Sequence, residues 1–393
     1  MTDNKFTAFM RKTPGYIKAS WKNFSFIYIF VVLFVLYACI ESRFNWNNIT
    51  NIFKHTAVIG TIALGMGLII ISGDIDLSVG SNFAFTGGLT IWAYNSMVKA
   101  GMGTEISMFI SIILAVAIGA TIGFINGFLV GKVKIPAFIA TLSTMLIFRS
   151  LCQYMCPKAT GGGSASTYTI YKTATIPSPW TKVNENIPGI EFPWVAVLLI
   201  VLVIAVWLFT KYTKFGRKIY AIGSNSRAAS LAGINVPWSK TTIFAIAGGL
   251  VGVAVFLHIS IRGAVESNSA GQSYELFAIA SCIIGGIAMS GGKGNIIGIL
   301  FGALSFTMNE KIIVAAGADP LVNNTIKGAI LLLAVMLQLI QGSTIKGLGL
   351  RIKSWFVPEK KLTALAGEAA ETTTEEKTTE ETTIEESSDK EEL

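Results

Sequence analysis

The sequence predicts an all-α integral membrane protein with about ten transmembrane helices. Of its 393 residues, 52% are hydrophobic and only 14% are charged, whereas soluble domains carry about 25% charged residues. The mean hydropathy is +0.60. The apolar residues form long blocks without apolar and polar alternation, which argues against an outer-membrane β-barrel.

A helix needs about 20 apolar residues to cross the hydrocarbon core of a bilayer. Apolar blocks with their flanks predict ten spans, and the first is expected to be an anchor because no small-residue cleavage site follows it. The predicted spans are 24–40, 56–72, 80–98, 106–130, 136–155, 193–209, 241–258, 276–290, 296–308 and 326–341.

Lysine and arginine fall unequally on the two sets of alternating loops. The set that begins with residues 1–23 holds 17 basic residues and Asp3 as its one acid, while the other set holds 8 basic residues and most of the acids. Because cytoplasmic loops are enriched in Lys and Arg, both termini are expected in the cytoplasm. The expected setting is a bacterial plasma (inner) membrane, crossed many times.

Three regions are expected along the chain: a cytoplasmic N-terminal segment 1–23, a transmembrane domain 24–358 and an acidic tail 359–393. The tail holds 12 acidic and 4 basic residues, and its low apolar content predicts disorder. The rest of the chain holds 27 basic and 11 acidic residues. We attribute this excess to orientation and lipid headgroups rather than nucleic acid, because no folded basic domain is predicted.

Two acids lie in the motif SGDIDLSVGSN, at Asp74 and Asp76. The 42 residues Ala57–Val98 have to hold two spans, so both acids are expected within a span or at its edge. Acids there are costly and usually face a cavity, a partner or a helix N-terminus. Either Asp76 caps the third helix or the motif lines a solute path through an interrupted helix. The candidate path residues are Asp74, Asp76, Ser78, Gly80 and Asn82.

The loop 211–240 carries six basic residues and no acid. A run of small residues, Ala228–Gly233, suits a short surface helix that fits the groove of another protein. Thirty patterned residues exceed what an orientation signal needs, so we favour a docking element over a plain basic loop.

Glycines recur every four residues in two places, where they would let another helix backbone approach closely. Their separation by five spans would fit an inverted repeat. The motif GGIAMSGGKG before the ninth span lacks the G-x-x-x-x-G-K-[ST] pattern of a phosphate loop and is interpreted as an interrupted membrane segment. The candidate helix-packing glycines are Gly119, Gly123, Gly127, Gly294, Gly298 and Gly302.

The sequence shows no catalytic or metal-binding constellation. His55 and His258 are its two histidines, and no cluster accompanies the four cysteines. We therefore expect no catalytic residue, no metal and no cofactor on this chain.

Five segments together carry a family resemblance: SGDIDLSVGS, KIPAFIATLSTMLIFRS, FGRKIYAIGSNSRAASLAGINV, CIIGGIAMSGGKG and IKGAILLLAV. In this order, over residues 57–341, they resemble the ribose/xylose/galactose-type ABC sugar importer permeases. Asp76, Ser78 and Gly80 match the signature segment of that family, and an acid at position 74 is similar to the xylose permeases.

The resemblance implies a non-enzymatic permease subunit for a monosaccharide, a pentose or hexose. It implies three partners: a cytoplasmic ATP-binding subunit, commonly a tandem fusion, that uses the ATP; an extracytoplasmic sugar-binding protein; and a second copy of this chain. It also implies a loop that contacts the ATPase. The expected coupling residues are Gly223, Ser224, Asn225, Arg227, Ala228, Ala229, Ala232 and Gly233.

Other transport classes remain open from the residues alone. Related ABC permeases for nucleosides, autoinducer-type sugars or branched-chain amino acids share this architecture. An ion-coupled secondary transporter would also have ten or more helices with buried acids, but it would not need the patterned loop 211–240.

Overall fold

The structure is a computed structural model that describes residues 26–160, 167–170 and 179–317, with a few more between 325 and 332. The chain divides into two compact units, Met1–Ala334 and Val335–Leu393, and all described residues belong to the first. The predicted N-terminal segment 1–23, most of the tenth span and the acidic tail 359–393 lie outside the described residues.

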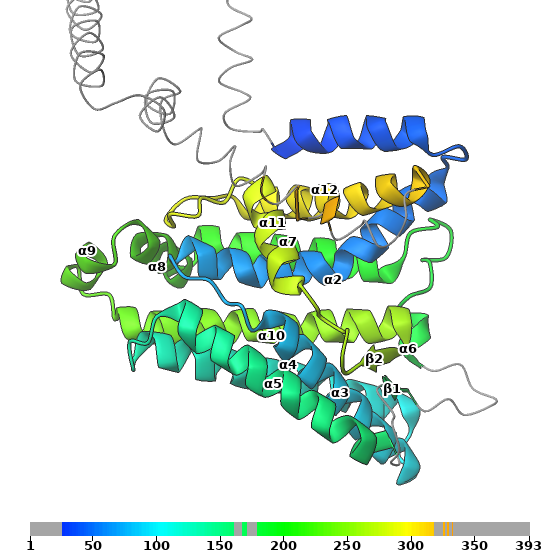
Figure 1. Cartoon of the computed structure of the whole chain (residues 1–393), viewed down its shortest axis with the longest axis horizontal. Helices are drawn as coiled ribbons and strands as arrows, with labels where there is room; N and C mark the ends of the chain where they lie inside the picture. Colours follow the sequence, from blue (N-terminus) through cyan, green and yellow to red (C-terminus); the bar gives the residue numbers. More distant parts are fainter. Residues whose placement is uncertain are drawn as a thin grey trace, which may run out of the picture. The chain divides into compact units, whose positions relative to one another are not determined.

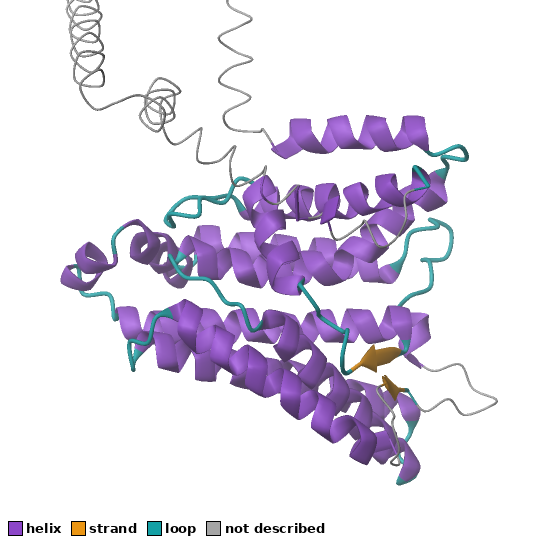
Figure 2. Ribbon diagram, viewed as in Figure 1, coloured by secondary structure: helices purple, strands orange, loops and turns teal. Residues whose placement is uncertain are grey.

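The described residues are mostly helical (Figure 2). A first helix, Phe26–Ile40, precedes the elements labelled in Figure 1. The longer helices that follow are α2 (Trp46–Ile71), α3 (Val79–Lys99), α4 (Thr104–Gly131), α5 (Ala137–Thr160), α7 (Trp194–Tyr212), α10 (Val236–Arg262), α11 (Tyr274–Ile284) and α12 (Ile296–Ala315). The short ones are α6 (Pro179–Lys182), α8 (Lys214–Ser224) and α9 (Ser226–Leu231).

Six of the helices in the described part of the chain are long and apolar enough to cross a membrane: α2, α4, residues 137–156 of α5, α7, α10 and α12. This confirms the prediction of a helical membrane protein. A helix also lies at each of the first nine predicted spans, while the tenth falls almost wholly outside the described residues.

The helix ends follow local sequence signals. Asn45 and Asn48 form a capping box at the start of α2. Asn235 caps α10, and Gly263, at φ 67°, ends it in the left-handed conformation that glycine favours.

Helix α10 packs against both α4 and α2 at the centre of the bundle (Figure 1). A Cβ atom built on Gly119 or Gly123 would meet backbone atoms of α10, and one on Gly127 would lie 2.7 Å from Thr241 Cα. These glycines therefore bring the two backbones into contact, as expected of small residues in membrane helices. A Cβ atom on Gly302 would meet the backbone of Ser281 in α11, and one on Gly298 that of Gly285, the residue that ends α11. Gly294 does not belong to this stripe, because it lies in the turn before α12 and faces Ile287.

Several predicted boundaries were wrong. Helix α2 begins at Trp46, so residues 46–55, predicted as a loop, are helical, and residues 72–78 remain free for a connection. The ninth span is also not short, because α12 runs for 20 residues to Ala315. The short helix at the glycine-rich segment is α11, with 11 residues.

The segment 156–192, between the fifth and sixth predicted spans, contains a strand. Strand β1 (Thr167–Thr169) pairs antiparallel with β2 (Ala264–Glu266), and Tyr168 stands opposite Val265. The buried Tyr168 hydroxyl donates a hydrogen bond of 3.2 Å to the carbonyl of Cys152 in α5. This small sheet fastens the segments that follow α5 and α10 to each other.

Candidate functional site

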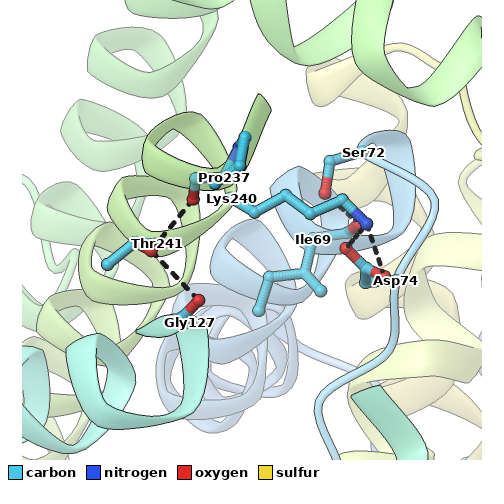
Figure 3. Close-up of polar contacts among 7 residues, drawn as sticks. All are labelled: Ile69, Ser72, Asp74, Gly127, Pro237, Lys240 and Thr241. Atoms are coloured by element: carbon cyan, nitrogen blue, oxygen red, sulfur yellow. Dashed lines mark hydrogen bonds and ion pairs between the residues drawn. The ribbon is translucent and has the colours of Figure 1, made fainter. Parts of the chain in front are cut away.

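The connection between α2 and α3, residues 72–78, is tied to the start of α10 by an ion pair. The Lys240 Nζ atom lies 2.7 Å from Oδ2 of Asp74 and donates a hydrogen bond of 3.0 Å to Oδ1 (Figure 3). The side chains are 20% and 11% exposed. A charge pair this well shielded from water interacts strongly, so Asp74 holds the connection onto α10.

Asp76 lies two residues before the N-cap of α3, Ser78, so it is not the helix cap that one interpretation of the motif predicted. Its Oδ1 accepts hydrogen bonds from the backbone N–H of Ser78 (2.7 Å) and from the Ser78 hydroxyl (2.6 Å). Asn126 of α4 donates to that hydroxyl (2.7 Å), and the backbone N–H of Leu77 donates to Thr141 of α5. The start of α3 is therefore fixed to both α4 and α5.

The other two candidate path residues also have partners within this chain. Asn82 donates to the Gly119 carbonyl (3.3 Å) and accepts from the Thr86 hydroxyl (2.9 Å). A Cβ atom at Gly80 would meet the carbonyl of Gly271, so the start of α3 touches the connection between α10 and α11. The structure thus brings Asp76, Ser78, Gly80 and Asn82 together, all of them buried.

A partly buried arginine holds the connection between α10 and α11 in place. Arg149 of α5 donates to the carbonyl oxygens of Ala270 (2.7 Å), Ser267 (3.2 Å) and Gly80 (3.4 Å). Backbone carbonyls inside a membrane protein need such donors. Arg149 lies in the motif KIPAFIATLSTMLIFRS, but no pattern in the sequence indicated this role.

The hydrogen bonds of Asp76 lead to a testable prediction. Asp76→Asn should keep uptake within about twofold of wild type, since the side-chain oxygen of Asn can accept the same two hydrogen bonds from Ser78. Asp76→Ala should lower the free energy of unfolding by about 1–3 kcal/mol, because it leaves buried donors of Ser78 without their acceptor. Thermal unfolding and uptake of the purified variants measure both effects. A loss of uptake by Asp76→Asn at unchanged stability would show instead that the carboxylate charge contacts the solute.

The loop 211–240 contains two short helices, α8 and α9, where one was predicted, and α9 overlaps the small-residue run. Asn225 ends α8 and caps α9, where its side chain accepts from the backbone N–H groups of Arg227 and Ala228, both at 3.0 Å. Because one residue serves both helices, the two are held at a fixed angle to each other.

Helix α8 is joined to the end of α2 and to the glycine-rich segment 285–295. A Cβ atom at Gly223 would meet the Ile71 carbonyl, and the Gly292 N–H donates to the same carbonyl at 2.8 Å. The Tyr220 hydroxyl donates to the Gly294 carbonyl (3.1 Å). Burial raises the pKa of Tyr220, which keeps its hydroxyl protonated as this bond requires.

The expected coupling residues divide between the interior and the surface. Gly223 packs on α2, and Ala229 is 5% exposed, so both serve packing within this chain. The exposed ones are Ser224, Asn225, Arg227, Ala228, Ala232 and Gly233. Leu231, which was not among the predicted coupling residues, is 86% exposed and projects from α9. The signal in the sequence was a single large apolar residue inside the small-residue run 228–233.

Among the described residues, no group of three or more His, Cys, Asp or Glu side chains is placed to hold a metal ion. Two connections, 72–78 and the glycine-rich segment 285–295, meet at the end of α8. Movement of α8 would reach both connections through backbone contacts.

Comparison with known proteins agrees with a transport role. Residues 48–335 match the family described as branched-chain amino acid transport system / permease component. The ribose import permease protein RbsC of Bacillus subtilis (strain 168) is 34% identical over 313 residues, which cover 79% of this chain and 91% of the relative. RbsC of Escherichia coli (strain K12) is 31% identical, covering 82% and 95%.

The xylose transport system permease protein XylH of Escherichia coli (strain K12) is 30% identical, covering 78% of this chain and 88% of the relative. No solved structure matches the chain. The match to the family extends from α2 through α12 and includes both connections and the helices α8 and α9. The chain is therefore an integral membrane protein that belongs to the permease component family of these transport systems.

Proposed function

We propose that this chain is the membrane-spanning subunit of an ABC importer for a monosaccharide, a pentose or a hexose. One observation carries the proposal: the chain matches ribose and xylose permeases over nearly their whole length. An extracytoplasmic binding protein delivers the sugar, and a separate cytoplasmic subunit, tandem-fused, hydrolyses ATP. Two copies of this chain form the transporter, and the chain itself needs no cofactor.

The ATPase docks on α9 in this proposal. Leu231 is an exposed apolar side chain surrounded by small residues. This shape allows Leu231 to enter an apolar groove of a partner protein. The segment 211–240 holds six basic residues and no acid, a charge composition typical of a cytoplasmic loop. A displacement of α9 by the ATPase would move α8 through their shared residue Asn225. Because Gly223 of α8 contacts the Ile71 carbonyl and Gly292, both connections would then move with α8.

Uptake into proteoliposomes tests the function. The full chain is reconstituted with its ATPase and binding protein, and labelled ribose, xylose, galactose and leucine are offered separately. We expect uptake of at least one sugar that requires ATP hydrolysis and persists with ionophores. Uptake of leucine alone would overturn the choice of substrate class, and uptake abolished by ionophores but not by ATP removal would overturn the ABC mechanism.

A substitution on α9 tests the docking role. Leu231→Glu should abolish both uptake and binding-protein-stimulated ATP hydrolysis, because a desolvated carboxylate at a packed interface is costly. The matched control is Val133→Glu, since Val133 is also apolar, 52% exposed and near the same end of the bundle. Co-purification of the ATPase with each variant gives the measurement. Normal association and uptake by Leu231→Glu would show that the ATPase docks elsewhere.

A further inference from the structure

A cavity of about 370 Å³ opens among α2, α10, α11 and α12. His55 comes from the third turn of α2, Arg262 ends α10, Tyr274 begins α11, and Glu310 and Lys311 lie in the second half of α12. Helices α2 and α10 reach α8 and α9 with their other ends, Ile71 and Val236. Figure 1 shows α8 and α9 at one end of α2 and α10, so the lining residues place the cavity toward the other end of these helices, away from those proposed to receive the ATPase.

The polar part of the lining offers both hydrogen-bond donors and acceptors. Arg262 and Lys311 only donate, Glu310 accepts when ionised, and Tyr274 and His55 can do both. Because a carboxylate shares the lining with the two cations, the cavity does not present a surface of one sign. Such a lining suits an uncharged solute rich in hydroxyl groups better than an anion.

The apolar part of the lining consists largely of aromatic rings. Phe277 and Phe306 lie with ring centroids 5.0 Å apart, and both line the cavity with Tyr274. Phe83 packs behind the wall, 5.1 Å from the rings of both His258 and Tyr274. Aromatic faces carry negative charge density, so they attract the polarised C–H face of a sugar ring.

We propose that this cavity is a station where one neutral monosaccharide rests after it leaves the binding protein, an inference that rests on the proposed sugar transport. Small-molecule pockets span about 300–1,000 Å³, and a volume near the lower limit fits a single sugar ring rather than an oligosaccharide. Asp76, Ser78, Gly80 and Asn82 do not line this cavity. The station is therefore separate from the SGDIDLSVGSN motif.

Protection of a cysteine at the mouth of the cavity tests the station directly. Val314 lines the cavity and is 66% exposed, so Val314→Cys should react with a neutral, water-soluble thiol reagent. The background is Cys39→Ser, because Cys39 is the exposed cysteine among the four, all of which are described. The control is Glu105→Cys, whose native side chain is 78% exposed outside the cavity. The full chain is used in lipid nanodiscs.

Millimolar ribose, xylose or galactose, whichever the wild type imports, should slow labelling of Val314→Cys severalfold and leave Glu105→Cys unchanged. In proteoliposomes, Glu310→Gln should lower uptake of that sugar about tenfold, the effect of losing one hydrogen bond to a charged group. Binding-protein-stimulated ATP hydrolysis should remain.

The outcomes separate this inference from the proposed function. If the wild type imports a sugar, but that sugar neither protects Val314→Cys nor depends on Glu310, the station is wrong and the sugar permease stands. If leucine or a sugar phosphate protects the cysteine and the sugars do not, the cavity holds another class of solute and the neutral-sugar station is overturned. If the wild type imports no sugar, the proposed function itself fails.

Discussion

Gly248→Ala is expected to disrupt the contact between α10 and α4, although it adds only one methyl group. The new Cβ atom would meet the Gly119 carbonyl oxygen in α4 and lie 3.0 Å from the Cα atom of Gly123. Backbone atoms cannot rotate away as a side chain can, so the helices have to separate. We expect a loss of more than about 1–3 kcal/mol in the free energy of unfolding, the usual range for overpacking, with little protein inserted in its active form.

The next residue provides the control. A Cβ atom at Gly249 would find its nearest neighbours, Ala120 and Val116, at 3.8 Å, an ordinary contact distance. Alanine is also favoured over glycine in a helix by about 1 kcal/mol, so Gly249→Ala should be neutral or slightly stabilising. Thermal unfolding in detergent and uptake at matched protein amounts measure both variants. Equal stability of the two would contradict the close approach of α4 and α10.

Much of the fold could be predicted because long apolar blocks specify membrane helices directly. The boundaries failed where polar residues continue a helix. His55 in α2 and Glu310 and Lys311 in α12 were interpreted as loop residues, yet they are helical and line the cavity. A hydropathy pattern does not distinguish a polar residue in a loop from one that faces a cavity between helices.

The candidate site was predictable in its location but not in its contacts. The motif at 71–82 does lie where two helices meet, and short helices do occupy 211–240. However, Asp74 and Lys240 are separated by 166 positions, and Arg149 reaches carbonyls more than 100 residues away. Such pairings depend on how the helices are arranged in space, which no local pattern in one sequence records.

Breaking the ion pair between Asp74 and Lys240 should uncouple the connection 72–78 from α10. Lys240→Met leaves the Asp74 carboxylate shielded from water and without its cation. Asp74→Asn leaves the Lys240 ammonium group without its anion. Removing one partner of a buried pair costs about 3–5 kcal/mol, somewhat less where some solvent reaches it. Lys132→Met is the control, because Lys132 is exposed at the same end of the bundle, where its Nζ atom lies 4.6 Å from the Trp238 ring.

The charge-reversed double variant, Asp74→Lys with Lys240→Asp, decides whether the pairing itself matters. If the ion pair holds the connection, each single variant should lose at least about tenfold in uptake, since 1.4 kcal/mol corresponds to a factor of ten. The double variant should recover a large part of that loss, because the two charges again attract each other, and a double-mutant cycle gives the coupling energy. Uptake and ATP hydrolysis are measured together at matched protein amounts. Two results would contradict this role of the ion pair: losses of uptake that simply add in the double variant, or uptake by Lys240→Met as high as that by Lys132→Met. Either would show that the connection is held by its backbone contacts with α8 and the segment 285–295 instead.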